Sequence, residues 1–401
     1  MRVRPHARST APLVAAALTL LIARPALAQD SREDEIAQRQ AEKATELRTY
    51  KPNKVEEVLK QFQDALVLAP NGAYPVFGSV YSGGGFTLGA GYRRYLGDRL
   101  NWNAMGLYSA KQYKLLELSL QSPRPLTGRL DFKAVAGWRD ANQVAFHGLG
   151  IDSPQAKTRY RMQQGYAGGD AWIRPLRWSV LHAGLTYESF TLADGFGNLP
   201  DTDDVFTPET APGIGDSPDF VHATTSAGID TRPSPEYARH GSLLDVAFHD
   251  YNDVHDAYSF RRVDVEAIHH IPIMRENWVL SLRGRMQSTI GDTDVVPYFL
   301  LPSLGSGSTL RGYSSWRFRD RHSLLMQAEW RWFPNRMALD TALFFDAGTV
   351  ADRRDALRLS DMKTDVGLGI RFHSPVATPL RVELAVGREG AKLVFGASAA
   401  F

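Results

Sequence analysis

From Tyr74 to the end of the chain, apolar and polar residues alternate one by one over short stretches. Such a period of two predicts β-strands that have one dry and one wet face. The clearest cases lie in the last hundred residues. Along 323–333, Leu324, Met326, Ala328, Trp330 and Trp332 oppose Ser323, Gln327, Glu329 and Arg331; along 380–387, Leu380, Val382, Leu384 and Val386 oppose Arg381, Glu383, Ala385 and Gly387.

This alternation predicts sixteen strands, an even number as bacterial outer-membrane barrels have. Their expected ranges are 76–82, 85–96, 101–111, 113–121, 128–140, 158–170, 178–190, 221–232, 242–251, 258–271, 277–291, 322–333, 339–348, 364–373, 380–388 and 391–401. Short connections (96–101, 174–177, 272–277, 374–379) alternate with long ones (142–157, 193–220, 291–321, 349–363). Short turns are expected to face the periplasm and long loops the outside.

A soluble sandwich would alternate in the same way, so two further features decide the fold class. The wet faces carry Arg, Glu and Asp well inside the strands, as a hydrated lumen would. Aromatic residues also crowd the strand ends, as interfacial girdles would: Trp102, Trp172, Trp178, Trp278 and Trp332. We therefore predict an all-β fold, a 16-stranded antiparallel transmembrane β-barrel over residues 74–401 with a short N-terminal helical extension.

Two segments precede the predicted barrel. Residues 1–28 combine a basic start, an apolar run and an Ala-x-Ala site before Gln29, which predicts a secretory signal peptide. Residues 29–73 begin with a polar leader, and apolar positions then recur at helical spacing over 55–68. We expect this amphipathic helix either to cap the periplasmic mouth of the barrel or to dock a separate periplasmic partner protein.

Composition narrows the function classes. The chain has no cysteine, which excludes a disulfide framework and a thiolate metal site. Its net charge of only +2 gives no basic field that would attract nucleic acid. We expect no cofactor, no metal and no enzymatic activity, because the chain has no G-x-S-x-G, H-E-x-x-H or P-loop motif. His249 and His255 lie near three aspartates, and we interpret that segment as a polar loop rather than a metal site.

The C-terminal part resembles a known family. Leu310-Arg311-Gly312-Tyr313 is similar to the (V/L)-R-G-(F/Y) loop motif of the bacterial surface antigen superfamily, the BamA/TamA-like outer-membrane assembly factors. Phe344-Phe345-Asp346-Ala347-Gly348 resembles its F-x-D-x-G strand motif, and 228–241 (GIDTRPSPEYARHG) its strand–turn segment. A terminal phenylalanine, Phe401, matches its assembly signal. The resemblance is strong over about 300–401, fair over 220–300 and weak over 74–220, and it suggests a barrel-only member that lacks POTRA domains.

The resemblance implies that the loop folds back into the barrel, where its arginine pairs with acidic groups on the inner wall. Strand parity allows this, because Glu329 and Asp346 both fall on wet faces of neighbouring strands. A guanidinium can bridge two carboxylates in a planar geometry that Lys does not offer. We therefore expect a latch of Arg311, Gly312 and Tyr313 against Glu329, Asp346 and Gly348; without the family motif, a solvated loop arginine would be the expected reading.

The first and last strands should meet at a weak closure seam. The expected first strand is short and is followed directly by Gly83, Gly84 and Gly85. Glycine weakens strands. The residues expected at the seam are Gly78, Gly83, Gly84, Gly85, Gly396 and Phe401.

Three functions remain open from the sequence. The first is outer-membrane biogenesis, in which protein or lipid moves through the lateral seam of a barrel with a loop-plugged lumen, in contact with outer-membrane lipid and with a periplasmic partner near 55–68. The second is a passive solute pore. The third is a surface antigen or adhesin that acts through its long loops. No role is assigned to Arg317, Arg319 and Arg321 beyond loop-base and headgroup contacts.

Overall fold

The structure is a computed structural model that describes residues 71–401 except 98–99, 123–128, 275, 292–295, 335–338, 374–377, 379, 397 and 399. The predicted signal peptide and the predicted helix at 55–68 lie outside the described residues. In the part of the chain that is described, no helix has the length and apolar character needed to cross a membrane.

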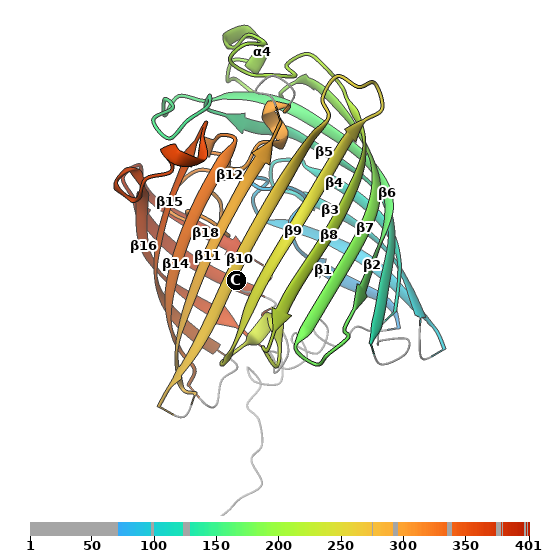
Figure 1. Cartoon of the computed structure of the whole chain (residues 1–401), viewed down its shortest axis with the longest axis vertical. Coiled ribbons are helices and arrows are strands. Elements are labelled where there is room, and N and C mark those ends of the chain that lie inside the picture. The colour runs from blue at the N-terminus through green and yellow to red at the C-terminus, as the bar shows by residue number, and fades with distance from the viewer. Residues whose placement is uncertain are drawn as a thin grey trace, which may run out of the picture. The chain divides into compact units, whose positions relative to one another are not determined.

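One antiparallel sheet of sixteen strands wraps around as a barrel, in which each strand pairs with the next along the chain (Figure 1). The predicted fold class is therefore confirmed. The strands of the sheet are β1 (Gly72–Phe77), β2 (Thr87–Leu96), β3 (Leu100–Ser109), β4 (Lys114–Gln121), β5 (Leu130–Phe146), β6 (Thr158–Ile173), β7 (Ser179–Asp194), β8 (Asp219–Asp230), β9 (Gly241–Asp253), β10 (Phe260–Ile273), β11 (Trp278–Ile290), β14 (His322–Trp332), β15 (Leu339–Ala351), β16 (Lys363–Phe372), β17 (Leu380–Gly387) and β18 (Gly390–Gly396).

The two terminal strands differ from the expectation. β1 spans Gly72–Phe77 rather than 76–82, because the residues that follow form a turn in which Gly83 and Gly85 have φ of +88° and +78°. Such angles are open to glycine and do not continue a strand. β18 ends at Gly396 instead of running to Phe401. β1 and β18 stand at opposite ends of the strand order, and no pairing joins them among the described residues.

The two faces of the sheet have opposite character. Large apolar side chains are exposed on the outside, for example Leu116 and Leu343, each 61% exposed. An apolar belt of this kind suits contact with lipid chains. Trp278 and Trp332 stack at 5.6 Å between ring centroids on this outer face. The prediction that Trp172 belongs to the aromatic girdle is wrong. Its ring stacks on His182, which pairs with Asp170 of the inner wall, so Trp172 faces the lumen.

The long connections gather at one end of the barrel, at the top of Figure 1, where the four-residue helix α4 (Thr202–Val205) also lies. Inside this end, a buried apolar cluster joins the wall to the connections. Tyr298 packs edge-on against Tyr160 at 5.0 Å, and its backbone N–H donates to the carbonyl of Pro212. Side chains from loop and wall thus fill the lumen here.

Candidate functional site: the plug loop and its buried arginines

The connection between β11 and β14 folds back into the barrel. We call residues 291–321 the plug loop, of which 292–295 are not described. A small hairpin inside it pairs β12 (Ser303–Leu304) with β13 (Phe318–Arg319). Leu304, Leu310 and Phe318 of the loop are buried with Leu325 and Val350 of the wall. This apolar packing places the Arg311-Gly312-Tyr313 turn against the wall formed by β14–β17.

Arg311 is fully buried and bonded on every side of its guanidinium. Its Nε and Nη2 donate to the two carboxylate oxygens of Asp346 at 2.7 and 2.6 Å, a bidentate pair. Its Nη1 donates to Oε1 of Glu329 at 2.6 Å and to Oε1 of Glu383 at 3.3 Å. The guanidinium carbon lies 3.5 Å from the centroid of the Phe344 ring. Three strands, β14, β15 and β17, therefore converge on one loop side chain.

The carboxylates around Arg311 are shared with other arginines of the wall. Glu329 also accepts from Arg331 at 2.8 Å and from both Nη atoms of Arg371 at 2.9 and 2.7 Å. Glu383 accepts from Arg371 at 2.8 Å and from Arg381 at 2.6 Å. All of these side chains are buried. Each charge thus has an opposite charge at hydrogen-bond distance, as buried ions require.

Removal of the loop arginine would leave this network unbalanced. Burial acts to lower the pKa of Arg311, but the carboxylates of Glu329, Asp346 and Glu383 outweigh burial and raise that pKa above its ordinary value. The guanidinium therefore stays charged and takes part in holding three acidic groups together. The charge balance of the inner wall therefore depends on insertion of the loop.

Glycines allow the turn to approach the wall closely. A Cβ on Gly312 would lie 2.6 Å from the Cβ of Asp365 and 2.9 Å from the backbone nitrogen of Gly387. A Cβ on Gly348 would lie 2.8 Å from a methyl of Leu304. Gly348 is therefore a close-packing position under the loop hairpin and makes no charged contact. The hydroxyl of Tyr313 donates to the carbonyl of Thr364 at 3.2 Å.

Two of the remaining loop arginines are interior residues, which corrects their interpretation as loop-base and headgroup contacts. Arg317 donates to Glu389 at 2.5 Å and to Ser153 at 2.9 Å. Arg319 is fully buried and donates to the carbonyl of Tyr298 at 3.0 Å. Only Arg321 lies at the loop base, where it donates to the carbonyl of Gly291.

The far tip of the plug loop reaches the start of the barrel. The Trp316 ring stacks on Tyr81 with 4.8 Å between centroids, and its indole N–H donates to the carbonyl of Ser82 at 3.0 Å. Gly83 is in the same connection, and a Cβ there would lie 3.2 Å from the Cβ of Ser315. The loop therefore links the β1–β2 connection to β14–β17.

The expected seam residues fall in different places. Gly78 directly follows β1, Gly83, Gly84 and Gly85 lie in the β1–β2 connection, and Gly396 ends β18. A Cβ on Gly396 would lie 2.4 Å from Nε of Arg381. The absence of a side chain at Gly396 therefore leaves space for the side chain of Arg381 along the wall. Phe401 lies away from the outer face: Arg331 donates to its carbonyl at 3.2 Å and sits 5.2 Å from its ring centroid.

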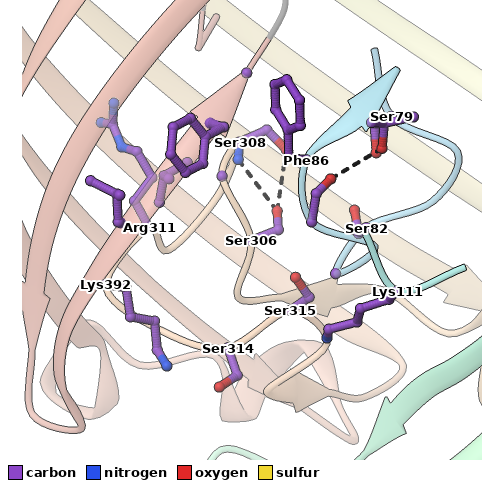
Figure 2. Close-up of a pocket in the computed structure, with 18 of the residues that line it drawn as sticks. Ser79, Ser82, Phe86, Lys111, Ser306, Ser308, Arg311, Ser314, Ser315 and Lys392 are labelled. Atoms are coloured by element: carbon purple, nitrogen blue, oxygen red, sulfur yellow. Dashed lines mark hydrogen bonds between the residues drawn. The ribbon is translucent and has the colours of Figure 1, made fainter. Parts of the chain in front are cut away.

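A cavity of about 620 Å³ lies where the two ends of the sheet come together (Figure 2). We call it the seam cavity. Most of its lining comes from the β1–β2 connection, the plug loop, β17 and β18, and the β3–β4 turn, the end of β5 and the β5–β6 connection contribute further residues. It includes Gly78, Gly83, Gly85 and Gly396 of the expected seam residues, together with Arg311 and Tyr313 of the expected latch.

No grouping of three or more metal-binding side chains occurs among the described residues. His249 is a strand residue of the inner wall and not part of a loop; it hydrogen-bonds His222 at 3.0 Å.

Comparison with known proteins agrees with this architecture. Residues 95–401 match the model of the Omp85 superfamily domain, which is more than half of the chain. The chain belongs to the Omp85 superfamily. The predicted relationship to BamA/TamA-like barrels is thereby confirmed, and the protein is an outer-membrane β-barrel. No curated protein matches the sequence.

Two solved structures show the same fold as this Omp85 barrel. The first is BamA from Haemophilus ducreyi lacking POTRA domains 1–3, with a TM-score of 0.59 and 16% identity over 81% of this chain and 69% of that one. The second is CdiB from Escherichia coli, with a TM-score of 0.57 and 14% identity over 80% of this chain. The match spans 61% of the CdiB chain. At these identities the likeness concerns the fold alone.

The sequence analysis did not include Arg371, Arg381 and Glu383 in the network of buried charges around Arg311. The signal was present, since all three fall on wet faces of strands that were predicted correctly. Their meeting point depends on how deeply the plug loop inserts, and strand alternation carries no such information.

Proposed function

We propose that the protein works in outer-membrane biogenesis, moving protein or lipid between barrel and bilayer through a lateral seam between β1 and β18. The observation that carries the proposal is the seam cavity, which lies where β1 and β18 are not paired among the described residues. Elsewhere around the barrel, each described strand is joined to its neighbours by a hydrogen-bonded ladder, so this is the position at which opening breaks the fewest strand hydrogen bonds.

The strands beside the seam are also short. β1 has six residues and β18 has seven, whereas β5 has seventeen. A short strand forms few ladder bonds, so the first and last hairpins need less free energy to separate than the long central ones. The plug loop contacts both sides of the seam, through Trp316 on Tyr81 and through Arg317 on Glu389 in the β17–β18 turn. Release of the loop would therefore favour seam opening.

The filled lumen supports transport through the seam over passive conduction. At the long-loop end, buried side chains such as Phe146, Phe190 and Tyr298 pack across the interior. A steady open pore needs a continuous hydrated path, which such packing narrows at this end of the barrel. We expect low, flickering conductance in planar bilayers; large, steady channels would favour the pore.

A periplasmic partner remains part of the proposal. The segment 55–68, outside the described residues, has the amphipathic pattern of either a docking helix or a cap on the barrel mouth. Copurification from native membranes distinguishes the two: a docked partner should be lost after deletion of 55–68, whereas a cap would leave the set of bound proteins unchanged.

Crosslinking across the seam tests the function directly. The rings of Phe86, beside β2, and Phe395 of β18 lie 6.4 Å apart, so cysteines at these positions can be joined by a short bismaleimide. The natural chain has no cysteine that would react in the background. The matched control joins Leu384→Cys and Leu393→Cys, which face each other across the β17–β18 ladder.

The variants should be expressed as the sole copy in the native host, and the protein and lipid contents of the outer membrane measured with and without crosslinker. Crosslinking Phe86→Cys to Phe395→Cys should change those contents, and the control pair should not. Unchanged contents at complete crosslinking of the seam pair would overturn the proposal.

A further inference from the structure

Lysines are rare in the barrel and gather at the seam cavity. Between residues 71 and 401 the chain has six lysines, namely 111, 114, 133, 157, 363 and 392. Three of them, Lys111, Lys157 and Lys392, line this one cavity. They come from three separate segments: the β3–β4 turn, the end of the β5–β6 connection and β18.

These three lysines lack acidic partners in the described part of the chain. The two arginines that also line the cavity, Arg311 and Arg381, are already bonded to carboxylates. Among the described residues, no Asp or Glu is part of the lining. Burial, followed by the charge of Lys157, lowers the pKa of Lys111, as expected for ammonium groups without a nearby counter-charge.

Hydroxyl groups complete a polar wall opposite the lysines. The plug loop contributes Ser306, Ser314 and Ser315, and Figure 2 shows the side chains of Lys111 and Lys392 extending from opposite sides toward the region of the two adjacent serines. Ammonium and hydroxyl groups are hydrogen-bond donors that suit the oxygens of a phosphate.

The outer rim of the cavity is apolar. On β18, Lys392 is turned inward, while Leu393 and Phe395 are turned outward and are 60% and 50% exposed. Phe86 lies across the seam from Phe395 and is 46% exposed. Ammonium and hydroxyl groups therefore line the cavity, and apolar side chains form its rim on the outer face of the sheet. Such polarity fits a molecule with an anionic head and apolar tails.

We propose that the seam cavity is a binding site for a phosphate-bearing headgroup, held by Lys111, Lys157 and Lys392. A volume of about 620 Å³ accommodates a phosphoglycerol head, within the range typical of ligand sites. The phosphate would accept from the three ammonium groups and the serine hydroxyls, while the acyl chains extend past Phe86 and Phe395. This binding goes beyond the proposed function, because it requires no movement of protein or lipid through the seam.

The test compares two full-length variants purified in neutral detergent. In the first, Lys111, Lys157 and Lys392 are all replaced by Gln; in the matched control, Lys114, Lys133 and Lys363 are replaced by Gln. Both lose the same charge. Native mass spectrometry would measure binding of phosphatidylglycerol, with inorganic phosphate as competitor and an uncharged diacylglycerol as a probe without phosphate. Unchanged heat-modifiable migration shows that each variant is folded.

We expect the cavity variant to bind phosphatidylglycerol at least tenfold more weakly than the natural chain and the control variant do. Diacylglycerol should bind weakly to all three proteins and to the same extent. Failure of millimolar phosphate to displace the lipid assigns the site to lipid, and full displacement assigns it to a free phosphate. Equal phosphatidylglycerol binding by all three proteins would overturn the proposal. If the triple variant does not fold, Lys392→Gln alone against Lys363→Gln gives the same comparison. Because no host phenotype is measured, these outcomes are independent of the crosslinking experiment.

Discussion

Arg311 of the plug loop and Asp346 of β15 form a buried, bidentate ion pair with hydrogen bonds of 2.7 and 2.6 Å, although thirty-five positions separate them in the chain. The pair restricts both the depth and the rotation of the turn, because the Nε and Nη2 edge of the planar guanidinium lies side-on to both carboxylate oxygens. The strand that holds Asp346 pairs with a neighbouring strand on both edges, so the loop is anchored to a strand that is hydrogen-bonded on both sides.

Arg311→Lys should fail to replace the arginine. A lysine ammonium is a point charge and does not reach Asp346, Glu329 and Glu383 with the same fork of donors. The lysine keeps the positive charge but leaves some of these buried carboxylate oxygens without a donor, which costs about 1–3 kcal/mol for each unsatisfied group. We expect a lower folded fraction by heat-modifiable migration and tryptic cleavage after Arg317 or Arg319 in intact cells. Arg353→Lys, which changes an exposed arginine, is the control and should behave as the natural chain. Equal protease resistance of both variants would show that the latch does not hold the loop.

Gly312→Ala tests close packing without a change of charge. The added methyl would lie 2.6 Å from the Cβ of Asp365, so the turn has to move off the wall. Overpacking of this kind costs about 1–3 kcal/mol. We expect a lower melting temperature in detergent and faster tryptic cleavage of the loop. The control is Gly165→Ala on β6, where an added Cβ meets nothing within 4 Å. A melting temperature for Gly312→Ala equal to that of the control would mean that the loop accommodates the methyl.

The sequence was sufficient for most of the fold because alternation reports directly on the two faces of a strand. It placed Glu329 and Asp346 on the inner wall, and the loop motif singled out Arg311. It failed where alternation continues beyond the end of a strand: Phe401 has the parity of Leu393 and Phe395 but lies against Arg331. It also failed for Trp172, because an aromatic residue at a strand end stacks equally well on a lumenal histidine. Contacts such as Arg317 with Glu389 depend on the path of a loop, which no periodicity encodes.

Trp316→Ala should loosen the tip of the plug loop. The ring stacks on Tyr81 and its N–H bonds to the carbonyl of Ser82, so truncation removes the contact between the loop and the β1–β2 connection. Because Arg311 remains in place, we expect a folded barrel whose conductance in planar bilayers is higher and more frequently open than that of the natural chain. Trp178→Ala, at an exposed position, is the matched control. Identical traces from the two variants would show that the stack does not restrain the loop.

His147 should make stability depend on pH. It is buried at the start of the β5–β6 connection and donates through Nδ1 to the carbonyl of Gln155 at 3.2 Å. Burial and the nearby Arg317 lower its pKa to about 4 from an ordinary value of 6.5. The folded state therefore binds its proton less readily than the unfolded state. Its contribution to stability is fully present above about pH 6.5 and is lost as the pH falls toward 4.

The measurement is the melting temperature in detergent at pH 7.5 and pH 5.0, for the natural chain and for His147→Asn. Asparagine keeps a donor near the Gln155 carbonyl but takes up no proton. Asp320 acts in the opposite direction, because burial raises its pKa to about 6 and the folded state then gains stability as the pH falls through that range. Asp320 is present in both proteins, so the difference between them isolates His147. The natural chain should lose a few degrees relative to His147→Asn on acidification; parallel changes in the two proteins would show that His147 is protonated without cost in the folded barrel.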